Sequence, residues 1–477
     1  MTREQNSDSA LDAFLPATRA WFREVFGRPT APQAMGWPAI QRGEHTLILS
    51  PTGSGKTLAA FLWGIDQLYR EIAAEAKDEG DEAEEGVRLL YVSPLKALNN
   101  DVERNLRRPL AGIRAAAEEM GTPLPRLEVL VRTGDTPQSA RRRMVKHPPH
   151  ILITTPESLY LILTSPVARD MFRTLHTVIV DEIHTLVSNK RGVHLAVSLE
   201  RAVELAAAGS TPGGESAGPG DAGPLPGDAV QRIGLSATQR PLEEVARFLG
   251  GYRYQSTDLP SAGKLVDWDT GRLVERPVTI VDAGMVKPVD LKVVTAAEDF
   301  RDLPGGSIWP AIIPRVMDLV EAHRTTLIFA NSRRQAERTA DRLNDLWLAR
   351  RAGTGQGAEA LTEDGTATNL GFAGSGTVGG PFRAHHGSVS RDARLHLEQA
   401  LKEGRLPALV GTSSLELGID IGTVDLVVQL QSPKGVARAL QRVGRSGHLV
   451  GQTSVGRFFP THREDLLESA AIVHAMR

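Results

Sequence analysis

The most constraining feature of the sequence is a glycine-rich segment between an apolar strand and a helical run. Residues 50–57 read Ser-Pro-Thr-Gly-Ser-Gly-Lys-Thr, after the run Thr46–Leu49 and before Leu58–Leu68. A P-loop requires this strand–loop–helix context. Its glycines let backbone N–H groups turn inward around phosphate oxygens, and the helix N-terminus adds the positive end of its dipole. The common pattern begins with glycine, whereas Ser50 stands in that place here.

The residue types of this segment predict separate roles in binding a nucleotide. Lys56 is expected to reach the β- and γ-phosphates, and the Thr57 hydroxyl to ligate Mg²⁺. The segment therefore predicts an ATP site with Mg²⁺ as its cofactor. The residues expected to contact ATP here are Thr52, Gly53, Ser54, Gly55, Lys56 and Thr57.

Two adjacent carboxylates form the second half of the predicted site. Asp181 and Glu182 directly follow the apolar run Val178–Val180. Open α/β sheets bind their ligands at the carboxyl ends of the strands, which is where these acids would lie. We expect Asp181 to hold Mg²⁺ through water, and Glu182 to orient and deprotonate the water that attacks ATP.

Short apolar runs occur in two sets along the chain, with amphipathic segments such as Arg333–Leu346 between many of them. Continuous apolar strands that alternate with helices favour parallel sheets covered on both faces. The chain is therefore predicted to be α/β, with two tandem domains. The first set is Thr46–Ser50, Leu89–Val92, Leu127–Val131, Ile151–Thr155, Val178–Val180 and Ile233–Ser236, and the second is Thr325–Phe329, Ala408–Gly411 and Val424–Gln429.

Composition excludes several classes of protein. The absence of cysteine among the 477 residues excludes disulfides, thiolate zinc sites and a cysteine nucleophile. No apolar run approaches about 18 residues, so we expect no membrane span and a cytoplasmic protein, associated with the nucleoid if it is bacterial. The net charge of −2 does not by itself indicate a nucleic-acid binder, although a global sum can hide a local basic groove.

Three stretches have compositions that cannot bury a useful apolar face. Residues 71–86 are strongly acidic, 209–228 consist mostly of Gly, Pro, Ala, Ser and acidic residues, and 351–381 are rich in Gly, Thr and Ala. We predict that all three are flexible loops. Without the acidic stretch, the rest of the chain has a net positive charge. The positive charge of the basic residues at the motifs is therefore not cancelled at the places where these residues would act.

The order of motifs resembles that of superfamily 2 helicases, and within them the Lhr (large helicase-related) family. Besides the P-loop and the acid pair, the general motifs are Phe26 with Pro29–Gln33, Ser93–Leu98, Thr154–Ser158, Ser236–Thr238, Ile328–Arg333, His385–Ser388, Gly411–Asp420 and Gln441–His448. Narrower, Lhr-like segments are Gly36–Ile40, Ser307–Pro310 and Thr461–Glu468.

This resemblance implies two RecA-like domains that sandwich ATP. It divides the chain into an N-terminal extension with an adenine-reading motif (1–45), a first domain (46–255), a linker (256–290), a second domain (291–460) and the start of a downstream region (461–477).

The resemblance also implies roles for individual residues. Gln33 would read the adenine, Ser236 and Thr238 would couple the ATP and nucleic-acid sites, and Gly418 and Asp420 would complete the nucleotide pocket. Gln441 and Arg445 would face the γ-phosphate, with Arg445 as the arginine finger, because a fixed cation stabilises charge developing on the transferred phosphoryl group. Many relatives end this motif with a second arginine, and whether His448 replaces it here stays open. The residues expected to grip nucleic acid are Pro94, Lys96, Thr155, Pro156, Asn331, Ser332, Arg333 and Thr412.

The activity that the resemblance implies is ATP-driven movement, 3′-to-5′, on single-stranded DNA. It also implies unwinding of DNA or RNA–DNA duplexes and a part in DNA repair. Two alternatives share nearly every motif: a translocase that moves on duplex without separating strands, and an ATP-gated clamp without motor activity. An unrelated P-loop protein does not explain the motif that contains Arg445.

Overall fold

The computed structural model describes residues 9–51, 53–75, 85–94, 96–209, 230–237, 241–256, 271–284, 288–303, 306–353, 380–416, 422–447 and 452–476. The chain divides into two compact units, Met1–Met285 and Val286–Arg477. None of the described helices is long and apolar enough to cross a membrane.

The first unit is built on a seven-stranded sheet of order β3-β4-β2-β5-β6-β1-β9, in which every pairing is parallel. All six strands expected in this part of the chain are present, with ends shifted by up to two residues. The strands are β1 (Thr46–Leu49), β2 (Leu89–Val92), β3 (Val129–Arg132), β4 (Ile151–Thr154), β5 (Thr177–Val180), β6 (Gln231–Ser236) and β9 (Thr279–Asp282).

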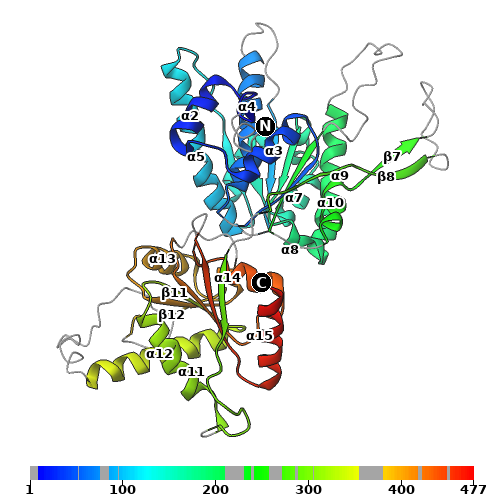
Figure 1. Cartoon of the computed structure of the whole chain (residues 1–477). Coiled ribbons are helices and arrows are strands. Elements are labelled where there is room, and N and C mark those ends of the chain that lie inside the picture. The colour runs from blue at the N-terminus through cyan, green and yellow to red at the C-terminus, as the bar shows by residue number, and fades with distance from the viewer. Residues whose placement is uncertain are drawn as a thin grey trace. The chain divides into compact units, whose positions relative to one another are not determined.

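Helices cover both faces of this sheet (Figure 1). Successive side chains of a strand point to opposite faces, so Ile48 joins one apolar core while Leu47 and Leu49 join the other. The first core lies under α2 (Pro16–Phe26), α3 (Ala31–Gln41), α4 (Lys56–Glu75) and α5 (Lys96–Glu119). The second lies under α7 (Pro156–Leu163), α9 (Lys190–Gly209) and α10 (Leu242–Gly250), and α6 (Gln138–Lys146), the 3₁₀ turn η1 (Ala168–Phe172) and the short α8 (His184–Val187) complete the unit.

The N-terminal segment, expected as an extension, is part of the core of the first unit. The Trp37 indole is fully buried, and its Nε1 donates to the Ala59 carbonyl at 3.0 Å. Phe14 packs edge-on against Trp37 with ring centroids 5.0 Å apart. The buried Asp66 carboxylate accepts from the Leu15 amide and the Thr18 hydroxyl. These contacts hold α2 and α3 against α4, the helix that starts at the P-loop.

The predicted linker 256–290 is wrong for its described residues, because it contributes strands to both units. β8 (Gly271–Glu275) pairs antiparallel with β7 (Tyr252–Ser256), and β9 adds a parallel edge strand beside β1. β10 (Val289–Val293) belongs to the second sheet. Their side chains are partly exposed and mix polar with apolar residues, so the segments lack the continuous apolar runs that marked the central strands.

Helices also extend into the three predicted loops. α4 continues to Glu75, where Glu71 and Glu75 pair with Arg88 at 3.5 and 2.7 Å. α9 reaches Gly209, and α12 reaches Gly353. The loop prediction is therefore wrong at 71–75, 209 and 351–353. Most of the remainder, 76–84, 210–229 and 354–379, lies outside the described residues.

The second unit has a six-stranded sheet of order β10-β15-β14-β11-β13-β12, again entirely parallel. The predicted class, mainly parallel sheets flanked by helices, is confirmed. The remaining strands are β11 (Thr326–Phe329), β12 (Arg383–His385), β13 (Ala408–Gly411), β14 (Leu426–Leu430) and β15 (Ser454–Phe459). α11 (Trp309–Glu321) and α12 (Arg333–Gly353) cover one face; α13 (Arg391–Lys402), α14 (Val436–Val443) and α15 (Arg463–Ala475) cover the other, and η3 (Ser413–Leu415) follows β13.

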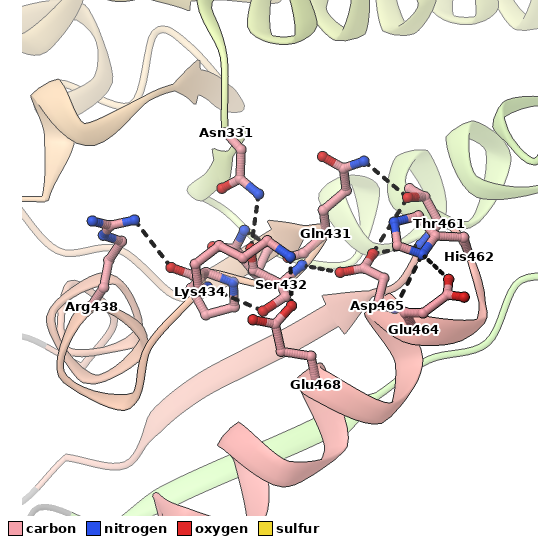
Figure 2. Close-up of polar contacts among 12 residues, drawn as sticks. Asn331, Gln431, Ser432, Lys434, Arg438, Thr461, His462, Glu464, Asp465 and Glu468 are labelled. Atoms are coloured by element: carbon pink, nitrogen blue, oxygen red, sulfur yellow. Dashed lines mark hydrogen bonds and ion pairs between the residues drawn. The ribbon is translucent and has the colours of Figure 1, made fainter.

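Residues 461–476 are an integral part of the second unit, although they were expected to begin a further region. Ile472, Val473 and Met476 of α15 lie in its apolar core. At the other end of the helix, the buried Asp465 carboxylate accepts from the Ser432 amide at 2.5 Å and the Thr461 amide at 2.8 Å (Figure 2). This carboxylate fixes the turn between β14 and α14.

Replacing Asp465 with Asn tests whether this carboxylate stabilises the second unit. The substitution puts an amino group opposite a backbone N–H, so a buried donor loses its acceptor, and we expect the free energy of unfolding to fall by about 1–3 kcal/mol. Thermal unfolding followed by calorimetry measures the change. Glu464→Gln, at an exposed carboxylate of the same helical turn, is the matched control and should shift the midpoint much less. Equal stability of Asp465→Asn and wild type would contradict the assignment.

Candidate functional site

The P-loop turns tightly between β1 and α4. Gly53 and Gly55 have φ values of 81° and 84°, a region that glycine adopts without the strain imposed by a side chain. A Cβ on Gly55 would lie 2.8 Å from the Gln33 Nε2, so a side chain here would displace the end of Gln33 in addition to straining the backbone. The sequence prediction of a strand–loop–helix at this place is confirmed.

Hydrogen bonds from Lys56, Ser54 and Gln33 hold the conformation of the loop. Lys56 is almost fully buried, and its ammonium donates to the Ser50 carbonyl at 3.0 Å. Ser54 donates to the Pro51 carbonyl at 2.7 Å. The Gln33 amide donates to the Gly55 carbonyl at 3.3 Å and accepts from the Thr30 amide at 2.9 Å, so Gln33 lies directly against the loop.

The acid pair lies where the sequence places it, directly after β5. Asp181 and Glu182 are both buried, and the Glu182 amide donates to the Asp181 Oδ1 at 2.8 Å. Glu182 has φ 47°, a left-handed conformation that is uncommon for a residue with a side chain and costs free energy. Burial and the neighbouring Glu182 charge raise the pKa of Asp181 to about 6, while Lys56 and Tyr91 act in the opposite direction.

Tyr91 is a contributor that the sequence reasoning missed. It lies on β2, next to β5 in the sheet, and its hydroxyl donates to the Asp181 Oδ2. Its ring stacks on Phe61, and burial, followed by the Asp181 charge, raises its pKa well above its usual range. It therefore stays a donor at neutral pH. The signal in the sequence was a tyrosine in a strand whose other residues are aliphatic, because a buried tyrosine hydroxyl needs a hydrogen-bond partner.

His184 connects the acid pair to the end of β6. The Ala237 amide donates to the His184 Nδ1 at 3.2 Å, so Nδ1 carries the lone pair and Nε2 the proton. That Nε2 lies 3.4 Å from the Glu182 Oε2, and the Ser236 hydroxyl lies 3.3 Å from Nδ1. The Ser236 carbonyl in turn accepts from the Ser50 amide of the P-loop at 3.2 Å. One connected set of polar contacts therefore joins P-loop, acid pair and β6.

The residues present fit a divalent cation. Asp181 is a buried carboxylate destabilised in its charged form by burial and by a second acid, and a nearby cation would relieve both effects. Oxygen ligands from Asp181 and Thr57, completed by phosphate oxygens and water, are the set that Mg²⁺ prefers. Asp181 and Thr57 are thus the residues that would hold it.

In the second unit, candidate nucleic-acid residues gather after the parallel strands β11 and β13. Asn331, Ser332 and Arg333 follow β11 and are exposed, and Thr412 follows β13. The Arg333 Nη1 donates to the Ser388 hydroxyl at 2.7 Å, and the Asn331 Nδ2 donates to the Ser432 carbonyl at 2.8 Å. The sheet thus brings these sequence-distant residues to one edge.

Other predicted contacts are buried or lie outside the described part of the chain. Thr155 is buried and caps α7 by accepting from the Ser158 amide, and Pro156 is buried beside it. The Pro94 carbonyl accepts from Arg191 at 2.8 Å. Thr52, Thr238, Gly418, Asp420, His448 and the Lys96 side chain lie outside what the structure describes.

The predicted arginine finger is buried near the end of α14. The Arg445 Nη2 and Nε donate to the Glu416 carbonyl at 2.8 and 3.2 Å. Gln441 lies on α14, one turn earlier in the chain. Arg445 is therefore held on the backbone that follows η3.

Comparison with known families supports the two-part layout. The DEAD/DEAH box helicase family matches residues 30–245, and the helicase conserved C-terminal domain matches residues 311–449. A curated relative, "Lhr helicase/ probable uracil glycosylase" of Mycolicibacterium smegmatis, is 47% identical over 476 residues, which are 99% of this chain and 28% of the relative. "ATP-dependent helicase Lhr-Core protein 2" of Thermococcus barophilus is 41% identical over all of this chain and 47% of its own length.

A solved structure agrees with these matches. The Mycobacterium smegmatis helicase Lhr, bound to ssDNA and AMP-PNP, has a TM-score of 0.75 and 46% identity, over 98% of this chain and 50% of that one. The predicted fold of two RecA-like domains is thereby confirmed. This chain spans half or less of the length of each of these relatives.

The environment of His184 predicts its titration. Burial, followed by the Lys56 charge, lowers its pKa from 6.5 to about 4, so the ring should be neutral at pH 7. Between those values the unfolded chain binds a proton that the folded chain does not, so this group's contribution to the unfolding free energy is lost as pH falls from about 6.5 to about 4. Histidine NMR, assigned by difference with His184→Asn, should show a midpoint near 4; a midpoint near 6.5 would contradict the buried, neutral ring.

Proposed function

The chain belongs to the Lhr family of superfamily 2 helicases, and we propose that it is an ATP-hydrolysing motor that moves along single-stranded DNA. The observation that carries this proposal is the buried pair Asp181–Glu182, joined through His184 and Ser236 to the P-loop. Structural proteins and passive binders have no need for two adjacent buried carboxylates beside a phosphate-binding turn, because burying such charge costs free energy.

In the proposed hydrolysis, the chain's own groups act around the terminal phosphates. Lys56 exchanges its bond to the Ser50 carbonyl for phosphate oxygens, and the amides of the P-loop bind alongside it. Asp181 and Thr57 would hold Mg²⁺, which would neutralise charge on the phosphates. Glu182 accepts a proton from the attacking water, and the His184 Nε2–H orients the Glu182 carboxylate.

The second unit is proposed to complete the reaction. Arg445 would stabilise the charge that develops on the transferred phosphoryl group, with Gln441, Gly418 and Asp420 in supporting contacts. Gln33 would read the adenine. Ser236 and Thr238 would report the state of the phosphates to the residues that grip nucleic acid. The position of Ser236, in contact with both His184 and the P-loop, supports this coupling.

Movement follows if the grip on nucleic acid differs before and after hydrolysis. The proposed contacts are Pro94, Lys96, Thr155, Pro156, Asn331, Ser332, Arg333 and Thr412, which would bind the backbone with little sequence selectivity. The complex of the mycobacterial relative with ssDNA supports single-stranded DNA as the track. We further propose 3′-to-5′ polarity, unwinding of DNA and RNA–DNA duplexes, and a role in DNA repair in the cytoplasm, at the nucleoid of a bacterial cell.

Glu182→Gln tests the assignment of the base. The amide keeps the shape of the carboxylate but cannot accept the proton, so we expect kcat for ATP to fall by at least about 100-fold. Binding of a fluorescent ATP analogue should be unchanged. Glu244→Gln, at an exposed carboxylate on α10, is the control and should hydrolyse ATP at the wild-type rate. Normal turnover by Glu182→Gln would remove Glu182 from this role.

A streptavidin-displacement assay tests movement and its direction. Single-stranded oligonucleotides carry biotin at one end, and a 3′-to-5′ motor should displace streptavidin from the 5′ end only, in the presence of ATP. Displacement from the 3′ end would reverse the polarity. ATP-dependent binding without displacement would favour the clamp, and displacement of a triplex strand without unwinding of a duplex would favour the duplex translocase.

A further inference from the structure

Arg442, in the motif that carries Gln441 and Arg445, makes four hydrogen bonds with the side chains of three residues. Its guanidinium is buried and donates through Nε to the Glu416 Oε1 at 2.8 Å and through Nη2 to the same oxygen. Its Nη1 donates to the Gln429 Oε1 at 2.7 Å and to the Asn331 Oδ1 at 3.2 Å. The guanidinium carbon lies 5.1 Å from the centre of the Phe329 ring.

Glu416 connects Arg442 to the proposed arginine finger. Its side chain is bound by Arg442, and its main-chain carbonyl accepts two hydrogen bonds from Arg445. Glu416 follows η3 and is itself buried, so a change in how its carboxylate is held must move the carbonyl to which Arg445 is bonded. The two arginines thus meet on one residue, through different atoms.

Asn331 connects Arg442 to the opposite side of the network. Its carboxamide is held at both ends. Arg442 donates to the oxygen, and the nitrogen donates to the Ser432 carbonyl (Figure 2). Ser432 is fixed by Asp465, which fills the turn where Gln431 and Lys434 have φ values of 66° and 65°. Asn331 nevertheless remains exposed, so a ligand can reach it while its amide stays aligned.

We propose that Arg442 is a positioning residue: it sets the guanidinium of Arg445 for ATP hydrolysis through the backbone of Glu416, and ties that setting to nucleic-acid binding through Asn331. The inference rests on the proposed function, since it takes Arg445 as the arginine finger. Contact of a nucleic-acid strand with Asn331 shifts the amide that Arg442 is bonded to, and the rigid guanidinium transmits the shift to Glu416.

A purely stabilising role explains this arrangement less well. Buried ion pairs are often no more stabilising than apolar side chains of similar volume, because removing two charges from water costs as much as their attraction returns. The guanidinium instead offers a planar set of donors whose directions are fixed, and here they reach three residues from separate parts of the chain. Lysine has the same charge but cannot hold these directions.

Arg442→Lys, compared with Arg438→Lys, is the experiment. Arg438 lies one turn earlier on α14, is half exposed, and approaches Glu416 only to 3.9 Å, which makes it a matched control. We expect Arg442→Lys to lower the DNA-stimulated kcat for ATP by about 10- to 100-fold, as a slightly misplaced catalytic group does. The KM for ATP should stay close to wild type, and the thermal midpoint should fall because buried acceptors lose their donors. Arg438→Lys should behave as wild type in both measurements.

Combination with Arg445→Lys separates positioning from a general effect. Loss of an arginine finger costs about 1,000-fold or more in kcat, and if Arg442 acts through Arg445 the double variant should lose nothing further. Radiolabelled ATP at high protein concentration resolves these low rates. Losses that multiply in the double variant would overturn the proposal, as would wild-type kcat in Arg442→Lys.

Glu416→Gln covers the case in which Arg442→Lys does not fold. It removes the charge to which both Arg442 hydrogen bonds are made and so weakens them, while the main-chain carbonyl stays in place. We therefore expect a fall in kcat at unchanged KM. Wild-type kcat in this variant overturns the proposal. If the wild-type chain does not turn over ATP, the proposed function and this inference both fail. If Arg445→Lys loses turnover while Arg442→Lys and Glu416→Gln retain it, this inference alone fails.

Discussion

The structure depends on how the charge of two adjacent carboxylates is compensated inside the first unit. Asp181 and Glu182 are buried at the end of a central strand, where an uncompensated charge would be strongly destabilising. Lys56 acts on Asp181 from the P-loop, Tyr91 from β2, and His184 lies against Glu182 from the start of α8. Every one of these partners comes from a different element, so the parallel order of the strands is what makes the site. Phosphates and Mg²⁺ would take over this compensation in the nucleotide-bound state.

The second unit instead buries cations, which also need compensation. Arg442 is compensated by Glu416, and Arg445 by a main-chain carbonyl of the same residue. The turn before α14 is held in place by Asp465 of α15, which fixes the start of the helix that leads to both arginines. Asp465, in the Lhr-like segment Thr461–Glu468, therefore supports the geometry of the helix that carries Gln441 and Arg442.

The sequence predicted the parts of this protein that obey local rules. Central strands are continuous apolar runs, and the P-loop and acid pair lie at their ends, so both could be located from pattern alone. The edge strands β9, β10 and β12 were not predicted, because partly exposed or short strands do not form such runs. The interior strand β15 was not predicted because Gly456 and Arg457 interrupt its apolar residues. Tyr91, Glu416 and Asp465 were not predicted to have a role, for a different reason. Each acts through a contact with a residue far away in the sequence; Tyr91 and Asp181, for example, are 90 positions apart.

The acid pair of the first unit and the two arginines of the second are proposed to make the rate of ATP turnover depend on nucleic-acid binding. Steady-state ATP hydrolysis by the 477-residue chain, measured across a titration with single-stranded DNA, tests it most directly. We expect a low basal rate and a saturable rise in kcat as DNA is added. A rate that does not depend on DNA, or binding of ATP with no turnover at any DNA concentration, would contradict it.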